Sequence, residues 1–190
     1  MMSDRMRRGR LGGAILALAA TLGASPGLAE GNGPEAASSV AVKAAFLYNF
    51  AKFTEWPALP PGAPIILCIE GNDEIAAALV ETVLRQKVSG HALEVWRHQD
   101  SAAWRRCHVL FVADAETRRS AAGLDGIKTL PVLTVSDGKG FGQAGGVIEL
   151  YVEDERMRFA INVDATERAG LHLSSRLLGL AKIIRNAHVQ

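Results

Sequence analysis

The chain has 190 residues, nearly half of them hydrophobic, with 21 lysine or arginine residues, 20 aspartate or glutamate residues and a formal charge of +1 at pH 7. A nearly neutral chain gives no electrostatic reason to expect nucleic acid or an anionic membrane as the main partner, since such binding depends on clustered basic residues. Its length suits one domain with an ordinary core.

The start of the chain has the pattern of a cleavable signal peptide. Four arginines precede an apolar run over residues 11–22, and the small residues Gly27 and Ala29 fit a cleavage site before Glu30. A membrane anchor is the alternative, but the apolar run is shorter than the roughly 20 residues that a spanning helix needs. We therefore expect residues 1–29 to be removed on export, which changes the formal charge to −2.

The folded domain is expected to begin after a short leader. Residues 30–39 are rich in Gly, Pro, Ala and Ser and show no apolar period, which predicts a disordered leader. The domain then spans residues 40–190. From Val40 onward, apolar residues recur at helical spacing and predict a first helix that ends near Trp56, before Pro57.

Short apolar runs alternate with helical patterns through the middle of the chain. Strands are predicted at residues 65–69, 93–96, 108–112 and 129–135, and helices at residues 73–85 and 115–124. Asn72 or Asp73 can cap the first of these helices. Alternation of this kind predicts a mainly parallel sheet with helices on both faces.

The last third of the chain has a different order of elements. Residues 147–152 and 157–163 are strand-like runs around a polar turn, which predicts a β-hairpin. A helix with an apolar face over residues 177–184 follows, with Ser174 or Ser175 as its cap. The predicted fold class is therefore α/β: a single domain with a mainly parallel mixed sheet flanked by helices, followed by a C-terminal β-hairpin and helix.

The chain has two cysteines, Cys68 and Cys107. An even number in an exported chain suggests a pair, and both lie in or beside apolar runs predicted to be neighbouring strands. Two buried free thiols are the alternative. We favour the disulfide, which would close a loop of roughly 40 residues and stabilise the fold by about 4 kcal/mol in the chain-entropy model.

A glycine-rich segment precedes the hairpin. Residues 140–145 read GFGQAG and match the G-x-G-x-x-G fingerprint of dinucleotide-binding folds. That fingerprint needs a helix next, whose N-terminal amides face the pyrophosphate, whereas a strand is predicted here. We therefore expect a flexible loop that binds no dinucleotide.

The sequence shows no constellation of catalytic or metal-binding residues. It has no G-x-S-x-G segment, and its five histidines lack H-x-x-x-H and H-E-x-x-H spacing. Three adjacent acidic residues at positions 153–155 are most simply a solvated turn. We expect no catalytic residue, no metal and no cofactor, and therefore no enzyme.

Two long segments are more distinctive than any catalytic motif. The first is residues 42–57 (VKAAFLYNFAKFTEWP), and the second comprises residues 159–163 (FAINV) and 167–178 (ERAGLHLSSRLL), with the glycine-rich loop before it. In this order the segments resemble the YfiR family of periplasmic proteins. The resemblance covers roughly residues 40–187, which is nearly all of the expected mature chain.

The resemblance implies a function that involves no chemistry. It implies a periplasmic repressor that binds and inhibits an inner-membrane diguanylate cyclase and is itself captured by an outer-membrane OmpA-like lipoprotein, controlling cyclic-di-GMP and biofilm formation. It also implies a homodimer. Some members of the family carry a second cysteine pair around the glycine-rich segment, and this chain lacks it. Redox control through that pair is therefore not expected here.

A repressor of this kind needs an exposed apolar or aromatic surface. In the first hairpin strand, Ile148 and Leu150 share one face and Glu149 and Tyr151 share the other, because successive side chains alternate. We take the first face as core and name Tyr151 and Glu149 as candidate partner-binding residues. The alternative is that Tyr151 is itself partly buried under a helix.

A small-molecule sensor is the alternative function. In that case a cleft at the strand ends would bind a ligand that sets the affinity for the partner. Arg168, His172 and Arg176 are the candidate residues for binding an anionic ligand. A solvated helix surface is the simpler explanation for these three residues.

Overall fold

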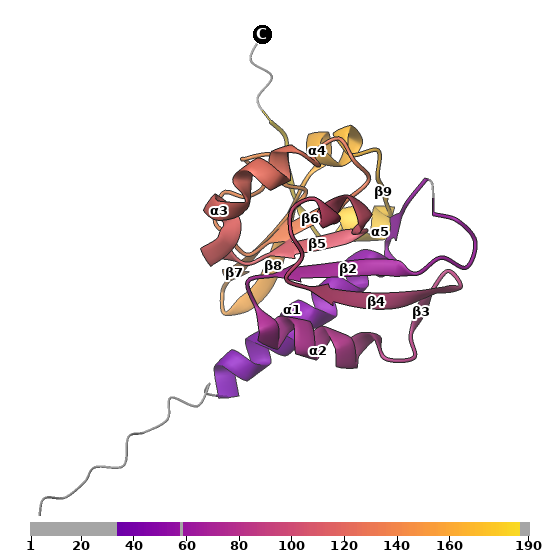
Figure 1. The fold of residues 1–190 in the computed structure, drawn as a ribbon. Coiled ribbons are helices and arrows are strands. Elements are labelled where there is room, and N and C mark those ends of the chain that lie inside the picture. Colours follow the sequence, from indigo (N-terminus) through magenta and orange to yellow (C-terminus); the bar gives the residue numbers. More distant parts are fainter. Residues whose placement is uncertain (1–33, 58, 187–190) are drawn as a thin grey trace, which may run out of the picture. The chain divides into compact units, whose positions relative to one another are not determined.

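The computed structural model describes residues 34–57 and 59–186, which form an eight-stranded mixed sheet with helices packed against it (Figure 1). The order of the strands is β10-β8-β7-β6-β5-β2-β4-β3. In chain order they are β2 (Ile65–Glu70), β3 (Lys87–Val88), β4 (His91–Arg97), β5 (Val109–Val112), β6 (Leu133–Ser136), β7 (Ile148–Glu153), β8 (Arg156–Asn162) and β10 (Lys182–Ile184). A two-stranded sheet pairs β1 (Thr54–Glu55) with β9 (His172–Leu173).

The centre of the large sheet is parallel, as predicted. Strand β2 pairs in parallel with β4 and β5, and β5 pairs in parallel with β6. Every residue of β5 and β6 is buried, and burial on both faces explains why β5 reads as a continuous apolar run. Strand β7 joins β6 in parallel and is followed by the antiparallel β8, so the predicted hairpin is confirmed.

The helices of the described ranges are α1 (Pro34–Lys52), α2 (Asp73–Val83), α3 (Asp114–Asp125), α4 (Val163–Arg168) and α5 (Ser175–Leu178), with a 3₁₀ turn at Ala103–Arg106. Two predicted caps are confirmed. The Asn72 side chain accepts a hydrogen bond from the Ile75 amide at 2.8 Å. The Ser174 hydroxyl accepts one from the Leu177 amide at 3.2 Å. Each cap satisfies a backbone amide that the first turn of a helix leaves unpaired.

The two crossover helices lie on opposite faces of the sheet. The connection from β2 through α2 leads to β4, whereas the connection from β5 through α3 leads to β6 in the opposite direction. Because both connections are right-handed, the reversal places α2 and α3 on different faces. Figure 1 shows α1 with α2 on one side of the sheet and α3 on the other.

The first helix differs from the prediction at both ends. It starts at Pro34, earlier than Val40, so the latter part of the leader predicted as disordered is helical. Proline at a first helical position followed by Glu-Ala-Ala favours a helix, since the missing amide proton costs nothing there. The helix ends at Lys52 and not near Trp56, because Thr54–Glu55 form β1.

The C-terminal helix is shorter than predicted. Helix α5 ends at Leu178, followed by Gly179 as its C-cap. Residues 182–184 then form β10, which pairs in parallel with β8. The consecutive isoleucines Ile183 and Ile184 suit a strand, and their pairing covers an edge of β8 that a helix would leave open.

The core is divided by the sheet into two apolar clusters. The larger one packs α1 and α2 against one face and includes Phe50, Phe111 and Leu133, all fully buried. The smaller one, on the other face, contains both cysteines together with Trp104 and Leu110.

No helix in the described parts of the chain is both long and apolar enough to cross a membrane. The predicted signal peptide lies outside the described residues, so it remains a prediction.

Candidate functional site

Four buried polar side chains gather on one face of the sheet, over β6, β7 and β8. They are Thr134, Ser136, Glu149 and Asn162, with exposed fractions of 9% or less. Their strand neighbours on the opposite face are apolar and belong to the larger core cluster. Burying polar groups is costly unless they are hydrogen-bonded, so this group needs partners.

Those partners are backbone groups of the glycine-rich loop, residues 138–146. The Glu149 carboxylate accepts hydrogen bonds from the amides of Gly140 at 3.1 Å and Gly142 at 2.9 Å. The Ser136 hydroxyl accepts one from the Gly138 amide at 3.0 Å. The Asn162 amide donates to the Gly142 carbonyl at 2.7 Å. The loop is therefore fixed over this face of the sheet.

The same face holds the elements on either side of the loop. The Thr134 hydroxyl accepts a hydrogen bond from the Val147 amide at 3.0 Å, which fixes the point where the loop enters β7. The side-chain oxygen of Asn162, Oδ1, accepts a hydrogen bond from the Ala165 backbone amide at 2.9 Å and caps α4. One buried asparagine thus connects the loop, the end of β8 and the start of α4.

Glycine is needed in this loop for two reasons. Gly140 and Gly145 have φ values of +83° and +101°, which L side chains rarely adopt. A Cβ atom on Gly142 would lie 2.7 Å from the Ile184 side chain, and one on Gly146 would collide with the Phe141 ring. The glycines therefore serve a tightly packed loop, and the strand β7 that follows confirms that this is not the helix-forming dinucleotide fingerprint.

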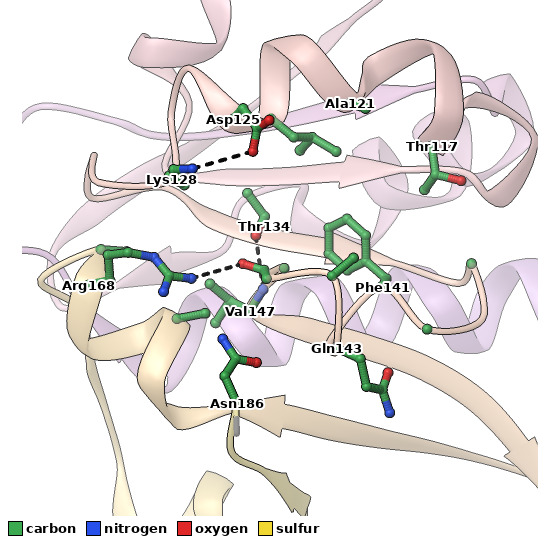
Figure 2. Close-up of a pocket in the computed structure, with 18 of the residues that line it drawn as sticks. Thr117, Ala121, Asp125, Lys128, Thr134, Phe141, Gln143, Val147, Arg168 and Asn186 are labelled. Carbon is green, nitrogen blue, oxygen red and sulfur yellow. Dashed lines mark hydrogen bonds and ion pairs between the residues drawn. The ribbon is translucent and has the colours of Figure 1, made fainter. Parts of the chain in front are cut away.

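A cavity of about 630 Å³ lies between this loop, α3, α4 and β6 (Figure 2). Its apolar lining includes Leu124, Val132, Phe141, Val147 and Ala169. A volume of this size is within the range of small-molecule sites. The cavity is our candidate functional site.

The charged residues that line the cavity are mostly basic: there is one carboxylate, Asp125, and there are four basic residues, Arg118, Lys128, Lys139 and Arg168. Lys128 pairs with that carboxylate at 3.6 Å. One guanidinium nitrogen of Arg168 donates to the Gly145 carbonyl at 3.4 Å. Among the described residues, Arg118, Lys139 and Arg168 form no ion pair within 4.0 Å. The cavity therefore carries an excess of positive charge.

The three predicted ligand residues do not all line this cavity. Arg168 lines the cavity, but His172 and Arg176 do not. His172 lies in β9, and the Arg176 guanidinium lies 5.6 Å from the centre of the Phe53 ring. Of the three, only Arg168 therefore lines this cavity, and an anion site that includes His172 and Arg176 stays a prediction.

The two predicted partner-binding residues also differ in their surroundings. Tyr151 is half-buried and keeps part of its side chain at the surface, where a partner could contact it. Glu149 is 9% exposed, and both of its carboxylate oxygens bind the glycine-rich loop. Glu149 therefore anchors a loop and is not part of the molecular surface.

Sequence reasoning missed the role of Thr134 and Asn162. Both are polar residues inside otherwise apolar strand runs, and a buried polar residue in such a run indicates a hydrogen-bonding partner outside the sheet. The basic residues Arg118, Lys128 and Lys139 carried no comparable signal, because lysine and arginine on a helix or loop are ordinary surface residues.

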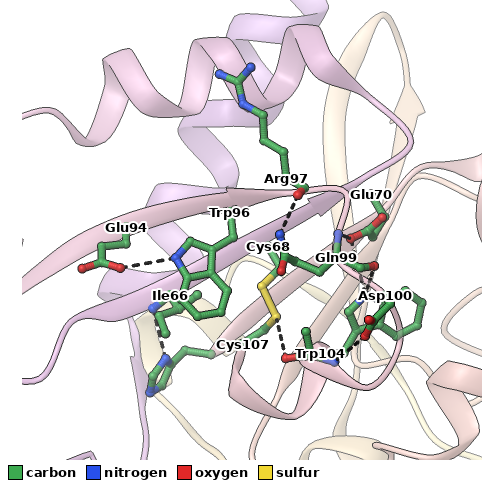
Figure 3. Close-up of a disulfide and its surroundings, with 12 residues drawn as sticks. Ile66, Cys68, Glu70, Glu94, Trp96, Arg97, Gln99, Asp100, Trp104 and Cys107 are labelled. Carbon is green, nitrogen blue, oxygen red and sulfur yellow. Dashed lines mark hydrogen bonds between the residues drawn. A yellow bond between two sulfur atoms is a disulfide. The ribbon is translucent and has the colours of Figure 1, made fainter.

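The structure contains the predicted disulfide between Cys68 in β2 and Cys107 just before β5 (Figure 3). The two Cα atoms are 5.8 Å apart, and both residues are buried. Nearby, the Glu70 carboxylate accepts hydrogen bonds from the Gln99 amide at 2.6 Å and the Trp104 indole at 3.4 Å. Burial nevertheless raises the pKa of Glu70 above its ordinary value of 4.5.

His108, the residue after Cys107, is expected to make stability depend on pH. Its Nδ1 accepts a hydrogen bond from the Ile66 amide at 3.0 Å, which requires a neutral ring. Burial, and secondly the charge of His91, lower the pKa of His108 below its ordinary value of 6.5. The stability contributed by the neutral ring is thus fully present above pH 6.5 and is lost as the pH falls from there through the folded-state pKa.

A His108→Gln variant tests this expectation, because glutamine keeps an acceptor for the Ile66 amide but does not titrate. Urea unfolding from about pH 8 to about pH 5 measures the free energy of unfolding of both proteins. The advantage of the wild type over the variant should shrink as the pH falls. A difference that stays constant across the range would contradict the expectation.

Comparison with known proteins gives one family match. The sequence profile of the YfiR/HmsC-like family matches residues 40–182. No curated protein sequence matches at a significant level. Among solved structures, the chain is similar to a conserved domain protein from Vibrio cholerae O1 biovar El Tor strain N16961, with 12% sequence identity and a TM-score of 0.47. That similarity covers 76% of this chain and 59% of the other, so this chain spans less than two thirds of the other chain's length.

Proposed function

The chain belongs to the YfiR/HmsC-like family, and on that premise we propose that it represses an inner-membrane diguanylate cyclase by direct contact in the periplasm. Proteins of this family are periplasmic regulators of diguanylate cyclases. The family match over residues 40–182 is the observation that carries the proposal, since it covers nearly all of the described domain. By lowering cyclic-di-GMP, such a repressor would limit biofilm formation.

The outer half of the β7–β8 hairpin supports this proposal as a contact surface. Strand β7 pairs with β6 only at Ile148 and Glu149, but with β8 as far as Glu153. Within the described residues, the outer half therefore has no neighbouring strand on its β6 side. On one face it carries Tyr151, which is half-buried, and on the opposite face Val152, whose side chain is 66% exposed. A partly exposed aromatic side chain is a typical anchor for a partner, so Tyr151 is the proposed contact.

Charged residues flank Tyr151 on its face of the hairpin. Arg158 pairs with Glu153 at 3.1 Å, and both side chains are about half exposed. Arg158 also lies opposite Tyr151 in the strand register. An aromatic residue with a polar rim resembles the composition of transient protein interfaces. We therefore keep Tyr151 as the proposed anchor and leave Glu149 out of the surface.

Cellular cyclic-di-GMP tests the repressor role. Deletion of the gene should raise the nucleotide level, and an unchanged level would contradict the role itself. Tyr151→Ala should weaken cyclase binding about 30-fold if the tyrosine contributes about 2 kcal/mol as an interface anchor, and repression should be lost in proportion. The abundance of the protein is measured in parallel, so that loss of binding is separated from loss of folded protein.

Leu84→Ala is the matched control, because Leu84 is another exposed apolar residue, at 58%, but lies at the end of α2. It should repress like the wild type. A stable Tyr151→Ala protein that still represses fully would contradict the hairpin surface while leaving the repressor role intact.

The proposal extends to the other partners that the family resemblance implies. We propose a homodimer and release of the cyclase when an outer-membrane OmpA-like lipoprotein captures the repressor. Light scattering on the purified protein gives the oligomeric state. Co-purification from membranes, with and without the lipoprotein, shows whether the two partners compete.

A second candidate function, small-molecule sensing, is supported by the cavity beneath the glycine-rich loop. Its volume of about 630 Å³ and its mixed apolar and basic lining are features of ligand sites. Sensing is compatible with repression, because a ligand that binds one conformation better shifts the population toward it.

A further inference from the structure

One side of the cavity is formed by a loop that the sheet itself holds in place. Thr134, Ser136, Glu149 and Asn162 are buried in strands and bond to the loop or its flanks. On the neighbouring part of the same sheet face, apolar residues fill the space below the 3₁₀ turn instead. The polar anchors hold the loop at a set position, and of the four only Thr134 lines the cavity.

The inner lining of the cavity is apolar on several sides. Leu124 of α3, Val132 before β6, Phe141 of the loop and Ala169 after α4 contribute side chains without hydrogen-bonding groups. Phe141 is only 7% exposed, so its ring is held in place as a wall. Such a lining suits the hydrocarbon or aromatic body of a ligand, since apolar area gains free energy when it leaves water.

Positive charge at the cavity calls for an acidic group on that ligand. Arg168, Arg118 and Lys139 line the cavity without an ion-pair partner within the described residues, and Lys128 already neutralises Asp125. Figure 2 shows the Arg168 side chain directed toward the loop carbonyl at the cavity. Only one of its five N–H donors is engaged there, which leaves a planar fork that can bind a carboxylate or a similar oxyanion.

We propose that this cavity binds a small amphipathic organic anion, with its apolar body against Phe141 and Val132 and its acidic group at Arg168. This inference names the ligand class for the sensing role and does not depend on repression of a cyclase. Of the three residues predicted to bind an anion, Arg168 lines this cavity and is assigned to it, whereas His172 and Arg176 are not.

Two fluorescent probes that share one ring system test the assignment. The anionic probe is 8-anilinonaphthalene-1-sulfonate, and the neutral probe is N-phenyl-1-naphthylamine, which lacks the sulfonate. The wild type should bind the anionic probe more tightly than the neutral one. Added salt should lower the affinity for the anionic probe more than the affinity for the neutral probe, because salt screens exposed charges. Equal affinity for both probes at low salt would overturn the assignment to an anion.

Arg168→Gln separates charge from apolar contact. It should lower the affinity for the anionic probe by about three- to fivefold, the upper part of the range expected for a partly exposed charge pair, and change the affinity for the neutral probe by less than about twofold. Arg176→Gln is the matched control, since it removes an exposed arginine outside the cavity, and it should leave both affinities unchanged. Equal effects of the two variants would overturn the role of Arg168.

Ala121→Phe locates the probe within the cavity. Ala121 lines the cavity from α3 and is exposed to it, so a larger side chain can occupy the space without entering the core. Binding of both probes should fall at least tenfold. Ala122→Phe, at an exposed position on the same helix outside the cavity, should bind like the wild type. Probe binding that survives Ala121→Phe would place the probe elsewhere and overturn the proposal.

A circular dichroism melting curve is measured for each variant, so that probe binding to partly unfolded protein is detected. The binding assays use purified protein without any cyclase. If the probes fail to bind as expected, the ligand-site proposal is contradicted and the repressor proposal is unaffected. If deletion leaves the cellular cyclic-di-GMP level unchanged, the repressor proposal is contradicted and the ligand-site proposal is unaffected.

Discussion

The Cys68→Ala/Cys107→Ala variant is expected to lose about 4 kcal/mol of the free energy of unfolding, which corresponds to a fall in melting temperature of roughly 8–16 °C for a domain of this size. The bond joins residues 39 positions apart, and it restricts the unfolded chain far more than the folded one. Alanine is chosen because both positions are buried in an apolar cluster, where a serine hydroxyl would add a separate cost.

The folded state should tolerate this change in structure. Cys68 is in β2, which is paired on both sides by β4 and β5, so the strand keeps its neighbours without the sulfur bridge. Trp104 and Leu110 continue to fill the apolar cluster around the site. The variant should therefore unfold cooperatively with the same final state but at lower denaturant concentration.

Urea unfolding with and without reductant checks this result. Reductant should move the wild type toward the variant and leave the variant unchanged, which identifies the bond as the cause. A loss below about 1 kcal/mol would contradict the expectation and show that the denatured chain is already compact around this loop.

The Asn162→Ala variant is expected to lose about 3 kcal/mol of the free energy of unfolding, since it leaves several buried groups without partners. The asparagine side chain donates to the Gly142 carbonyl at 2.7 Å and to the Asn186 side chain at 2.9 Å, and accepts from the Ala165 amide at 2.9 Å. The last of these is the cap of α4, worth about 1 kcal/mol by itself.

The matched control is Asn49→Ala. The Asn49 side chain is exposed on α1 and donates to the Ala45 carbonyl within the same helix. Its replacement should change stability by less than about 0.5 kcal/mol. Comparable losses for the two variants would show that the buried network contributes no more than a surface contact.

Hydrogen exchange distinguishes loop anchoring from a general loss of stability. Relative to the wild type, Asn162→Ala should accelerate exchange of the glycine-rich loop amides more than exchange of the β5 amides, since β5 lies in the centre of the sheet. Uniform acceleration across both would contradict the role of Asn162 as an anchor of the loop.

Much of the fold follows from local patterns in the sequence. Strands β2 and β5 are recognisable because a strand covered on both faces must be apolar at every position. The caps Asn72 and Ser174 are recognisable because their side chains act within three residues. The hairpin was predicted from two strand-like runs around a polar turn, and Asp154 and Glu155 there adopt the positive φ values of a two-residue connection.

Contacts between distant segments decided the remaining elements. Strand β10 forms because Ile183 lies beside Ile161 of β8, and β1 forms because Thr54 pairs with Leu173. In both cases the partner is far away in the chain, so the local period carries no sign of it. The apolar spacing of residues 177–184 predicts a helix as readily as the short helix and strand that are found.

In the candidate site too, local sequence determined some features and contacts between distant segments determined the others. The sequence by itself determined that the glycine-rich loop enters a strand, which excluded a dinucleotide fold, and it identified Arg168 as a possible anion ligand. Only the tertiary structure showed that Glu149 and Asn162 bond to that loop and that Arg168, but not His172 or Arg176, lines the cavity beside it. The reason is physical: alternation along a strand determines which residues share a face, but what covers that face depends on how distant elements pack against it.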